Sequence, residues 1–190
     1  NNAGMGARIN VNKPFLIMMQ HPVTTEKNNR RNIETTLRAI DAINLPTVVF
    51  WPNSDAGTSD MAKAIRIYRE HGKLRNQKLH FVTDILPEDF IALLRRASVL
   101  VGNSSSGIKE ASYLGVPVVN IGSRQSNRLR GPNVIDVDYD DAEIKKAIKD
   151  QLTHGPYQKS EVYYKKDTSK KITAILSRVK LYTQKKFYDN

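Results

Sequence analysis

The stretch VLVGNSSSGIKE, residues 99–110, joins a short apolar run to a polar segment through three serines that stand between two glycines. The apolar residues 99–101 are typical of a buried strand, and residues 107–114 are expected to form a helix. A strand that passes through a short loop into a helix is the repeating unit of parallel α/β sheets. This stretch therefore predicts the fold class, and its loop carries a concentration of hydrogen-bond donors.

The serine loop has the composition of an anion site. A helix N-terminus presents backbone N–H groups without helical partners and about half a positive charge, so it attracts phosphates. Gly102 and Gly107 let the backbone approach a ligand closely, and the serine hydroxyls add donors, so the loop is predicted to suit a diphosphate. Glu110, one helical turn later, is placed to accept hydrogen bonds from two ribose hydroxyls. The structural alternative is a capping serine followed by a first-turn acid.

Two other motifs are weighed against this loop. It is not a Walker A loop, because no Gly-Lys-Ser/Thr follows. Asn103, Ser105 and Gly107 imitate the nucleophile elbow of serine hydrolases, but the first glycine of that motif is absent. The one histidine downstream of Ser105 is His154, in a polar turn beyond a predicted helix. That position does not suit a catalytic triad, so a hydrolase is not favoured.

Short apolar runs alternate with amphipathic stretches along the rest of the chain. Strands are expected at residues 15–20, 47–51, 79–82, 99–101, 116–121 and 134–137, and helices at residues 30–43, 59–70, 87–97, 107–114, 140–152 and 168–182. This alternation predicts an α/β, doubly wound parallel sheet of Rossmann-like type. We expect a connector over residues 1–13, the Rossmann-like domain over residues 14–164 and a basic C-terminal helix over residues 165–190. In such sheets ligands bind beyond the carboxyl ends of the strands.

Three further loops at those ends hold candidate site residues. His21 follows the first main strand, where a histidine can donate to a phosphate or transfer a proton near neutral pH. The loop of residues 122–131 contains three arginines, including Arg124 and Arg128, and is predicted to be mobile and to bind phosphates with paired N–H groups. Asn53 stands in an Asn/Asp/Gly turn. The alternatives are a structural histidine, a solvated basic loop and a simple turn.

Composition restricts the function classes. Lysine and arginine number 30 against 19 acidic residues, so the net charge is +11, and the chain has no cysteine. The basic charge suits nucleotides and phosphates, and nucleic acid is not expected because no aromatic-rich RNA motif or helix-turn-helix pattern accompanies it. His71, His80 and His154 lack metal-ligand spacing, so we expect no metal. No membrane partner is expected, and a cysteine-free chain fits the cytoplasm.

Taken together, the loops resemble those of the hydrolysing UDP-N-acetylglucosamine 2-epimerases. The resemblance runs from about Pro14 to Tyr157. Its motifs are QHPVTTE (residues 20–26), WPNSDAG (51–57), VGNSSSGIKE (101–110), GVPVVNIGSRQ (115–125) and NVI (133–135). Non-hydrolysing epimerases usually have an arginine-rich loop after the histidine and a second glycine in the serine loop. Pro22, Val23, Thr24 and Ser106 depart from that pattern, which favours the hydrolysing branch.

The resemblance implies a role for each candidate residue. Ser104, Ser105 and Gly107 would bind the diphosphate of a UDP-sugar, and Glu110 would hold the ribose. The backbone of Ile85 and Leu86, with Phe90 behind it, would contact uracil. His21 and Arg124 would be catalytic, and Asn53 and Arg128 would also face the phosphates and sugar.

The resemblance also implies the whole enzyme. The chain would be the C-terminal half of a two-domain GT-B fold, with a missing N-terminal domain that supplies the catalytic carboxylates. The reaction would remove the C2 proton, expel UDP to leave a glucal, and add water to release N-acetylmannosamine, a step toward sialic acid or related sugars. No cofactor is implied, the fragment alone would be inactive, and a homo-oligomer is an open possibility. The alternative is the C-terminal nucleotide-sugar domain of a GT-B glycosyltransferase.

Overall fold

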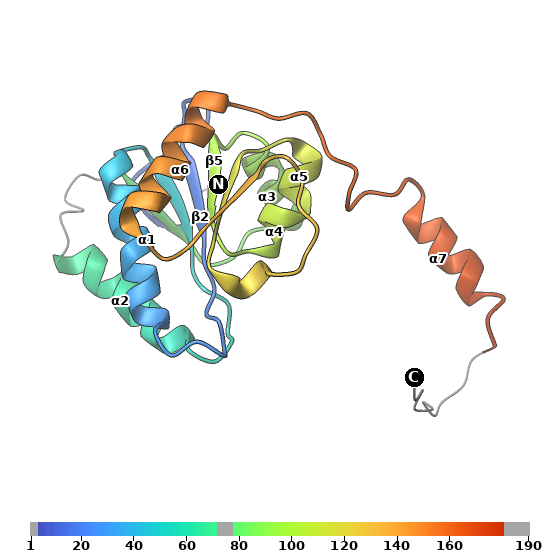
Figure 1. Ribbon diagram of the computed structural model, residues 1–190, viewed down its shortest axis with the longest axis horizontal. Coiled ribbons are helices and arrows are strands. Elements are labelled where there is room, and N and C mark those ends of the chain that lie inside the picture. Colours follow the sequence, from blue (N-terminus) through green and yellow to red (C-terminus); the bar gives the residue numbers. More distant parts are fainter. Residues whose placement is uncertain (1–3, 72–77, 181–190) are drawn as a thin grey trace.

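The computed structural model describes residues 4–71 and 78–180. These residues form a seven-stranded sheet with helices on both faces, which confirms the predicted α/β, doubly wound class (Figure 1). The strand order is β1-β4-β3-β2-β5-β6-β7. The strands are β1 (Met5–Gly6), β2 (Leu16–Met19), β3 (Thr47–Phe50), β4 (Leu79–Val82), β5 (Val99–Gly102), β6 (Val118–Ile121) and β7 (Val134–Val137).

The parallel strands β2 to β7 follow the winding order of Rossmann folds. The chain first builds the sheet outward from β2 through β3 to β4, and then returns to the other side of β2 to add β5, β6 and β7. The reversal lies between β2 and β5, where Ile17 pairs with Leu100 and Met19 with Gly102. In open α/β sheets a crevice forms beyond the carboxyl ends of the two strands at this switch point. The loops after β2 and β5 therefore border the expected binding crevice.

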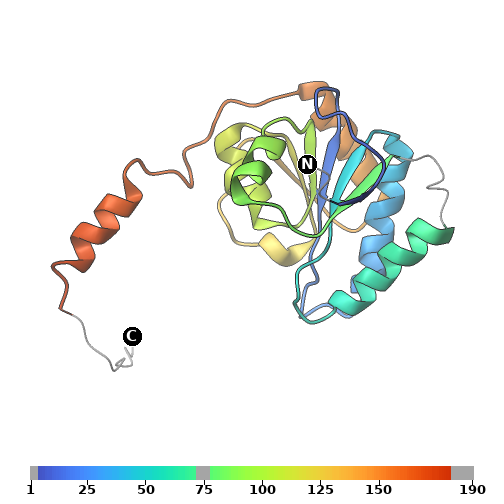
Figure 2. The same cartoon turned by 180° about the vertical axis from the view of Figure 1, so that it is seen from behind.

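The helices lie in two layers. α1, α2 and α6 cover one face of the sheet, and α3, α4 and α5 cover the other, as the two opposite views show (Figures 1 and 2). Their bounds are α1 (Asn29–Ile43), α2 (Thr58–His71), α3 (Pro87–Leu94), α4 (Ser105–Ile108), α5 (Glu110–Leu114) and α6 (Asp141–His154).

Alternate residues of the central strands fill two hydrophobic cores. Leu16 and Met18 of β2 pack in the core under α1, α2 and α6, whereas Ile17 packs in the core under α3 and α5. All three side chains are buried. Each such apolar side chain contributes about 1.5–3 kcal/mol of transfer free energy. The two cores together hold the carboxyl ends of the strands, and hence the site loops, in fixed positions.

The helix expected at residues 107–114 differs from the structure. It begins two residues earlier, at Ser105, because the Ser104 side chain accepts a hydrogen bond from the Ser106 N–H and caps it. It is also interrupted at Lys109, whose φ of −98° and ψ of −74° separate α4 from α5. Apolar spacing cannot locate a start that depends on a polar cap.

Strand β1 was not predicted. Met5 and Gly6 pair antiparallel with Phe81 and His80 of β4, so part of the segment expected to be a connector joins the sheet. Two residues that include a glycine carry no alternating pattern, and the pairing is visible only once β4 is in place. The sheet is therefore parallel except at this edge.

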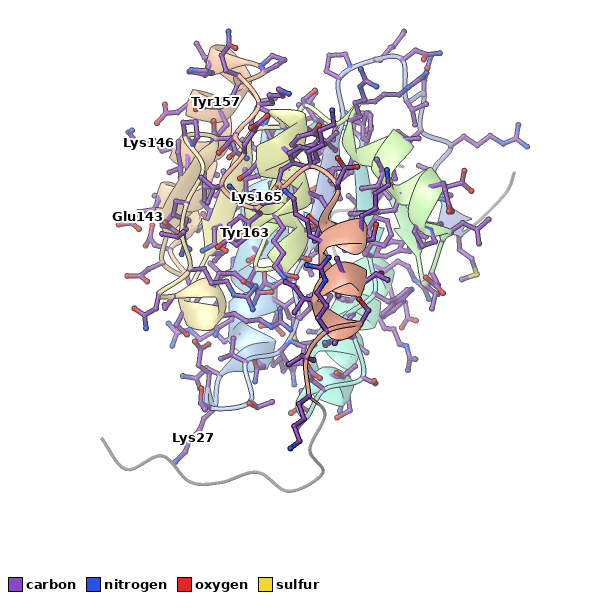
Figure 3. All side chains as sticks on the ribbon, turned by 90° about the vertical axis from the view of Figure 1, so that its right-hand side faces the viewer. Lys27, Glu143, Lys146, Tyr157, Tyr163 and Lys165 are labelled. Atoms are coloured by element: carbon purple, nitrogen blue, oxygen red, sulfur yellow. The ribbon has the colours of Figure 1, made fainter. Side chains whose placement is uncertain are left out.

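The chain after α6 leaves the body of the molecule. Residues 157–164 run across α5, and α7 (Thr168–Leu176) then projects away without a buried residue (Figures 1 and 2). Lys165 lies at the start of this projection, next to Tyr163 (Figure 3). The helix was expected to reach Tyr182, but it ends at Leu176, and residues 181 and 182 lie outside the described residues.

Candidate functional site at the switch point

The loops after β2 and β5 are joined by a reciprocal pair of hydrogen bonds. The His21 backbone N–H donates to Asn103 Oδ1 at 2.7 Å, and Asn103 Nδ2 donates back to the His21 carbonyl at 2.8 Å. Asn103 is fully buried. Gly102 makes this approach possible, because its φ is +133° and a Cβ there would lie 2.1 Å from the Met19 carbonyl oxygen. Gly102 and Asn103 therefore hold the loops after β2 and β5 together at the switch point.

The His21 ring is held as a neutral hydrogen-bond donor. Its Nδ1 accepts a hydrogen bond from the Asn53 backbone N–H at 3.1 Å, which leaves the proton of the neutral ring on Nε2. Burial, and then the nearby positive charge of Arg124, lower the pKa of His21 to about 4, although Asp55 opposes them. The ring is therefore uncharged near neutral pH in the free chain. It can donate a hydrogen bond to a phosphate, but the expected proton transfer near pH 7 is disfavoured before a ligand binds.

Arg124 lies over the same junction. It belongs to the 3-10 helix η2 (Ser123–Gln125), and its Nη1 donates to the Asn103 carbonyl at 3.3 Å. Its Nη2 lies 3.6 Å from Asp55 Oδ2, so the loop after β3 supplies its counter-charge. A guanidinium between the loops after β3 and β5 is placed to meet an anion that enters the crevice.

The turn after β3 presents an acceptor. Asn53 Nδ2 donates to Asp55 Oδ2 at 2.6 Å, and the Thr58 hydroxyl bonds to the Asn53 carbonyl. Asn53 Oδ1 is buried and has no partner among the described residues. The side chain therefore offers an oxygen to a ligand, which suits a sugar hydroxyl or amide N–H better than a phosphate.

A cavity of about 310 Å³ opens beside these groups. His21, Asn53, Ile85, Phe90 and Ser106 contribute to its wall, so it joins the carboxyl ends of β2 to β5. The remaining lining residues are Met19, Phe50, Trp51, Pro52, Thr83 and Asp84. Phe90 packs edge-on against Phe50 with 5.7 Å between ring centroids, which makes that end of the cavity apolar and aromatic. A flat base at this end and phosphates at the His21 end would fit the two kinds of wall.

The serine loop borders this cavity through Ser106. Ser104 is buried as the cap of α4, and Ser105 is the first residue of that helix. Gly107 faces the sheet, where a Cβ would lie 2.9 Å from side-chain atoms of Leu100 and Val118. Close packing of helix against sheet is therefore a sufficient reason for glycine at position 107.

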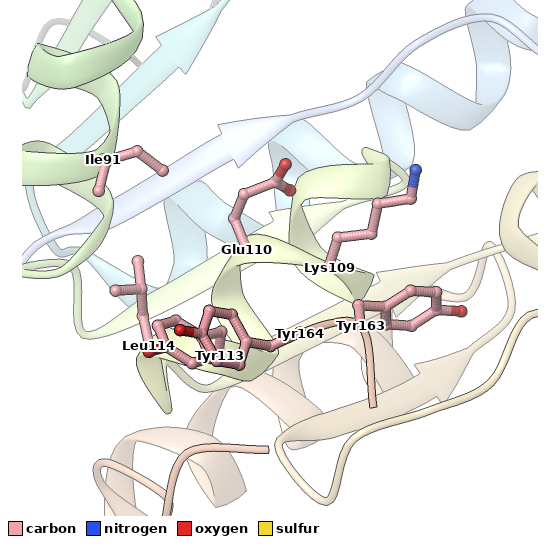
Figure 4. A pocket seen from close by; sticks show the side chains of 7 residues that line it. All are labelled: Ile91, Lys109, Glu110, Tyr113, Leu114, Tyr163 and Tyr164. Carbon is pink, nitrogen blue, oxygen red and sulfur yellow. The ribbon is translucent and has the colours of Figure 1, made fainter. Parts of the chain in front are cut away.

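Glu110 is predicted to hold the ribose, but it does not line the 310 Å³ cavity. It lines a second, more apolar cavity of about 450 Å³ with Ile91, Lys109, Tyr113, Leu114, Tyr163 and Tyr164 (Figure 4). In this view Glu110 and Lys109 point away from the stacked rings of Tyr113 and Tyr164, whose centroids are 4.4 Å apart. Glu110 Oε2 is buried without a hydrogen-bond partner among the described residues. The carboxylate thus keeps an acceptor available beside the predicted diphosphate loop.

Two predicted site residues lie farther out. Leu86 is 67% exposed and does not line the 310 Å³ cavity, although its neighbour Ile85 does. Arg128 is exposed, and its carbonyl accepts a hydrogen bond from Arg130. Arg130 itself is paired with Asp136 at 3.0 Å.

The arginine loop was predicted to be mobile, but it is anchored at both ends. Buried Gln125 donates to the Asn103 carbonyl at 2.8 Å, and Arg130 holds β7 through Asp136. Of the loop's three arginines, Arg124 faces the crevice.

Sequence reasoning assigned no role to several residues that build the junction. Asn103 lies in the motif of residues 101–110 and Gln125 in the motif of residues 115–125, but an asparagine or glutamine gives no signal of its hydrogen-bond partners. Glu26 and Tyr139 are 113 residues apart in the chain, and they meet only because the carboxyl ends of β2 and β7 lie on the same side of the sheet. Their contact depends on topology, which no local pattern contains.

The described residues contain no group of three or more metal-binding side chains and no helix long and apolar enough to cross a membrane. The fold and site instead define a doubly wound domain with a histidine, an arginine and a serine loop gathered at its switch point. The chain belongs to the UDP-N-acetylglucosamine 2-epimerase family, whose model matches residues 2–177.

Two relatives support the assignment. The chain is 32% identical over 153 residues to the UDP-N-acetylglucosamine 2-epimerase of Neisseria meningitidis, covering 80% of this chain and 39% of the relative. It is also 32% identical over 173 residues to the hydrolysing UDP-N,N'-diacetylbacillosamine 2-epimerase of Legionella pneumophila, covering 90% and 45%. The chain thus spans less than half the length of either relative. The match favours an epimerase over the glycosyltransferase alternative.

Solved structures confirm the fold. The Methanocaldococcus jannaschii UDP-GlcNAc 2-epimerase in complex with UDP-GlcNAc and UDP aligns with a TM-score of 0.68 at 17% identity, over 88% of this chain and 46% of that one. The Neisseria meningitidis enzyme bound to UDP-GlcNAc aligns with a TM-score of 0.64 at 15% identity, over 90% and 46%. In each case the chain matches less than half of the longer protein, as expected for one half of a GT-B fold.

Proposed function

We propose that the chain is the UDP-binding half of a hydrolysing UDP-N-acetylglucosamine 2-epimerase. The whole enzyme would convert UDP-N-acetylglucosamine to N-acetylmannosamine and UDP, with its catalytic carboxylates in a further domain. The observation that carries the proposal is the convergence of His21, Asn53, Arg124 and Ser106 around the switch-point crevice. Family membership and the names of both relatives supply the reaction class.

The site residues suit the step in which UDP leaves. Once the C2 proton is removed, the bond between C1 and the phosphate oxygen breaks, and negative charge grows on the diphosphate. The Nε2–H of His21 and the guanidinium of Arg124 then act as donors to that charge. Donors already in place at a developing anion are commonly worth about 3–4 kcal/mol each. His21 is suited to this role as a neutral imidazole, because its pKa is lowered to about 4.

The remaining site residues are proposed to bind and orient the substrate. The serine loop and Ser106 would hold the diphosphate, and Glu110 would accept bonds from the ribose. Phe90 and the backbone of Ile85 would receive uracil at the aromatic end of the cavity. The unpartnered Asn53 Oδ1 would accept a hydrogen bond from the sugar. Arg128 lies outside this set unless the second domain brings the substrate toward it.

A binding titration tests the proposal. UDP is added to the wild-type chain, to Arg124→Gln and to the matched control Arg95→Gln, which removes an equal charge from the exposed end of α3. Loss of a charge-assisted hydrogen bond should weaken UDP binding at least about tenfold in Arg124→Gln only. Equal affinities for all three proteins, or no binding by the wild type, would refute the proposed site.

A further inference from the structure

A second set of hydrogen bonds, made by Glu26, joins the loops of the crevice outside the residues that face the ligand. Glu26, in the loop after β2, accepts a hydrogen bond from Ser123 Oγ at 2.6 Å. Its other oxygen accepts from Asn32 Nδ2, at the start of α1, at 3.0 Å. Ser123 is directly followed by Arg124. A single carboxylate therefore connects the loop that carries His21 with the loop that carries Arg124.

Tyr139 adds contacts to this hydrogen-bonded group. Its hydroxyl interacts with the side chains of Glu26, Asn32 and Asn103, and burial followed by the charge of Glu26 raises the pKa of Tyr139 to about 12. The hydroxyl is therefore protonated at physiological pH and lies beside the Glu26 carboxylate. Gly122 allows the approach, because a Cβ at that position would lie 2.5 Å from the Tyr139 ring. The chain of contacts runs from Glu26 through Tyr139 to Asn103, which also holds His21.

We propose that Glu26 is a positioning residue. Its hydrogen bonds to Ser123 and Asn32, which we call the clasp, join the loop that carries His21 to the loop that carries Arg124. They hold His21 and Arg124 at the separation that a diphosphate requires. The inference rests on the proposed function for its ligand. It adds a residue that touches no substrate and acts through Ser123 and Tyr139. The neighbouring Lys27 points away from the body (Figure 3).

The direction in which Glu26→Gln changes UDP affinity distinguishes this positioning role from a purely electrostatic effect. Removing a carboxylate near an anion site should by itself strengthen UDP binding, because a repulsive charge is lost. Glu26→Gln should instead weaken it, because the amide cannot accept hydrogen bonds from both Ser123 and Asn32 with two oxygens. The matched control is Glu143→Gln, which makes the same charge change on α6, where the side chain points outward (Figure 3).

The experiment measures UDP affinity by calorimetry for the wild type, Glu26→Gln, Ser123→Ala, Tyr139→Phe and Glu143→Gln, with thermal unfolding of each sample. We expect roughly tenfold weaker binding for Glu26→Gln, on the scale of one charge-assisted hydrogen bond, and smaller losses for the two single-arm variants. Glu143→Gln should bind as well as the wild type or slightly better. Unchanged or tighter binding by folded Glu26→Gln would overturn the clasp.

Hydrogen exchange provides a readout that needs no ligand. The Ser126 amide donates to the Ser123 carbonyl and closes η2. It should lose protection in Glu26→Gln and Ser123→Ala and keep it in Glu143→Gln. Equal protection in all variants would refute the clasp even if UDP binds. The wild type could fail to bind UDP while the Ser126 amide still loses protection in Glu26→Gln and Ser123→Ala. That result would refute the proposed function and the diphosphate role, but it would support the connection between the two loops.

Discussion

At the scale of single residues, the site depends on how His21 is surrounded. Its backbone is bonded on both sides by Asn103, and its Nδ1 faces the Asn53 amide. The ring therefore has one orientation and one neutral tautomer. A histidine that ends a strand was expected to be functional, but its partners and its lowered pKa follow only from the buried junction. A role for His21 at the candidate site could be predicted from the sequence, whereas its protonation state could not.

The His21 ring should titrate far below an ordinary histidine. Burial and Arg124 lower its pKa from the ordinary 6.5 to about 4, so the neutral ring favours the folded state above pH 6.5, and this contribution is lost as pH falls through 4. Bound UDP should raise the pKa, because the diphosphate stabilises the charged ring. Proton NMR of the ring resonances, with and without UDP, measures both values. A free-chain pKa near 6.5 would contradict the buried, neutral histidine.

At the scale of elements, the serine loop combines a cap with a tight contact. Ser104 begins α4, and Gly107 lets that helix lie directly on β5 and β6. The sequence predicted a strand, a loop and a helix in the right order at residues 99–114. It did not reveal the early start at Ser105 or the break at Lys109, because both depend on hydrogen bonds and packing against neighbouring strands.

Gly107→Ala should destabilise the fold more than an ordinary helix substitution. A Cβ would lie 2.9 Å from Leu100 and Val118 side chains in a filled core, and overpacking of this kind costs about 1–3 kcal/mol. Gly155→Ala provides a comparison with pure backbone strain, since nothing lies within 4 Å of its Cβ and its φ of +74° with ψ of −162° is nearly restricted to glycine. Urea unfolding gives both free energies. A loss below about 0.5 kcal/mol for Gly107→Ala would contradict the packing role, because substitutions without such a contact usually stay within that range.

At the scale of the whole molecule, the body and α7 differ in packing, because the body has buried cores and α7 has no buried residue. The body has two cores on a doubly wound sheet, and this architecture was predictable from the alternation of apolar runs and amphipathic stretches. α7 has Ile172, Ile175 and Leu176 exposed by 51%, 64% and 58%. Amphipathic spacing predicted a helix there, but spacing alone does not say whether its apolar side meets the same domain.

Polar substitutions in α7 should leave the stability of this chain nearly unchanged. Ile172→Ser and Ile175→Ser remove exposed side chains, so the free energy of unfolding should change by less than about 0.5 kcal/mol. Ile148→Ser in α6, where the side chain is fully buried, should cost at least about 2 kcal/mol. Denaturant unfolding of the three variants makes the comparison. A large loss from either α7 substitution would mean that the helix packs on the body.

The chain by itself should bind UDP but turn over nothing. The proposed reaction needs a base for the C2 proton, and the catalytic carboxylates are proposed to lie in the further domain, while His21 is neutral and accepts a hydrogen bond at Nδ1. Incubation of the purified chain with UDP-N-acetylglucosamine, followed by an assay for N-acetylmannosamine and UDP, checks this. Measurable release of both products would show that the chain is catalytically complete.

A crystal structure of the chain with UDP would show where the nucleotide binds. We expect the diphosphate at the switch point, against the serine loop and Arg124 and within hydrogen-bonding distance of His21 Nε2, with uracil beside Phe90. Density for the nucleotide at another place, with the crevice between β2 and β5 empty, would contradict this expectation.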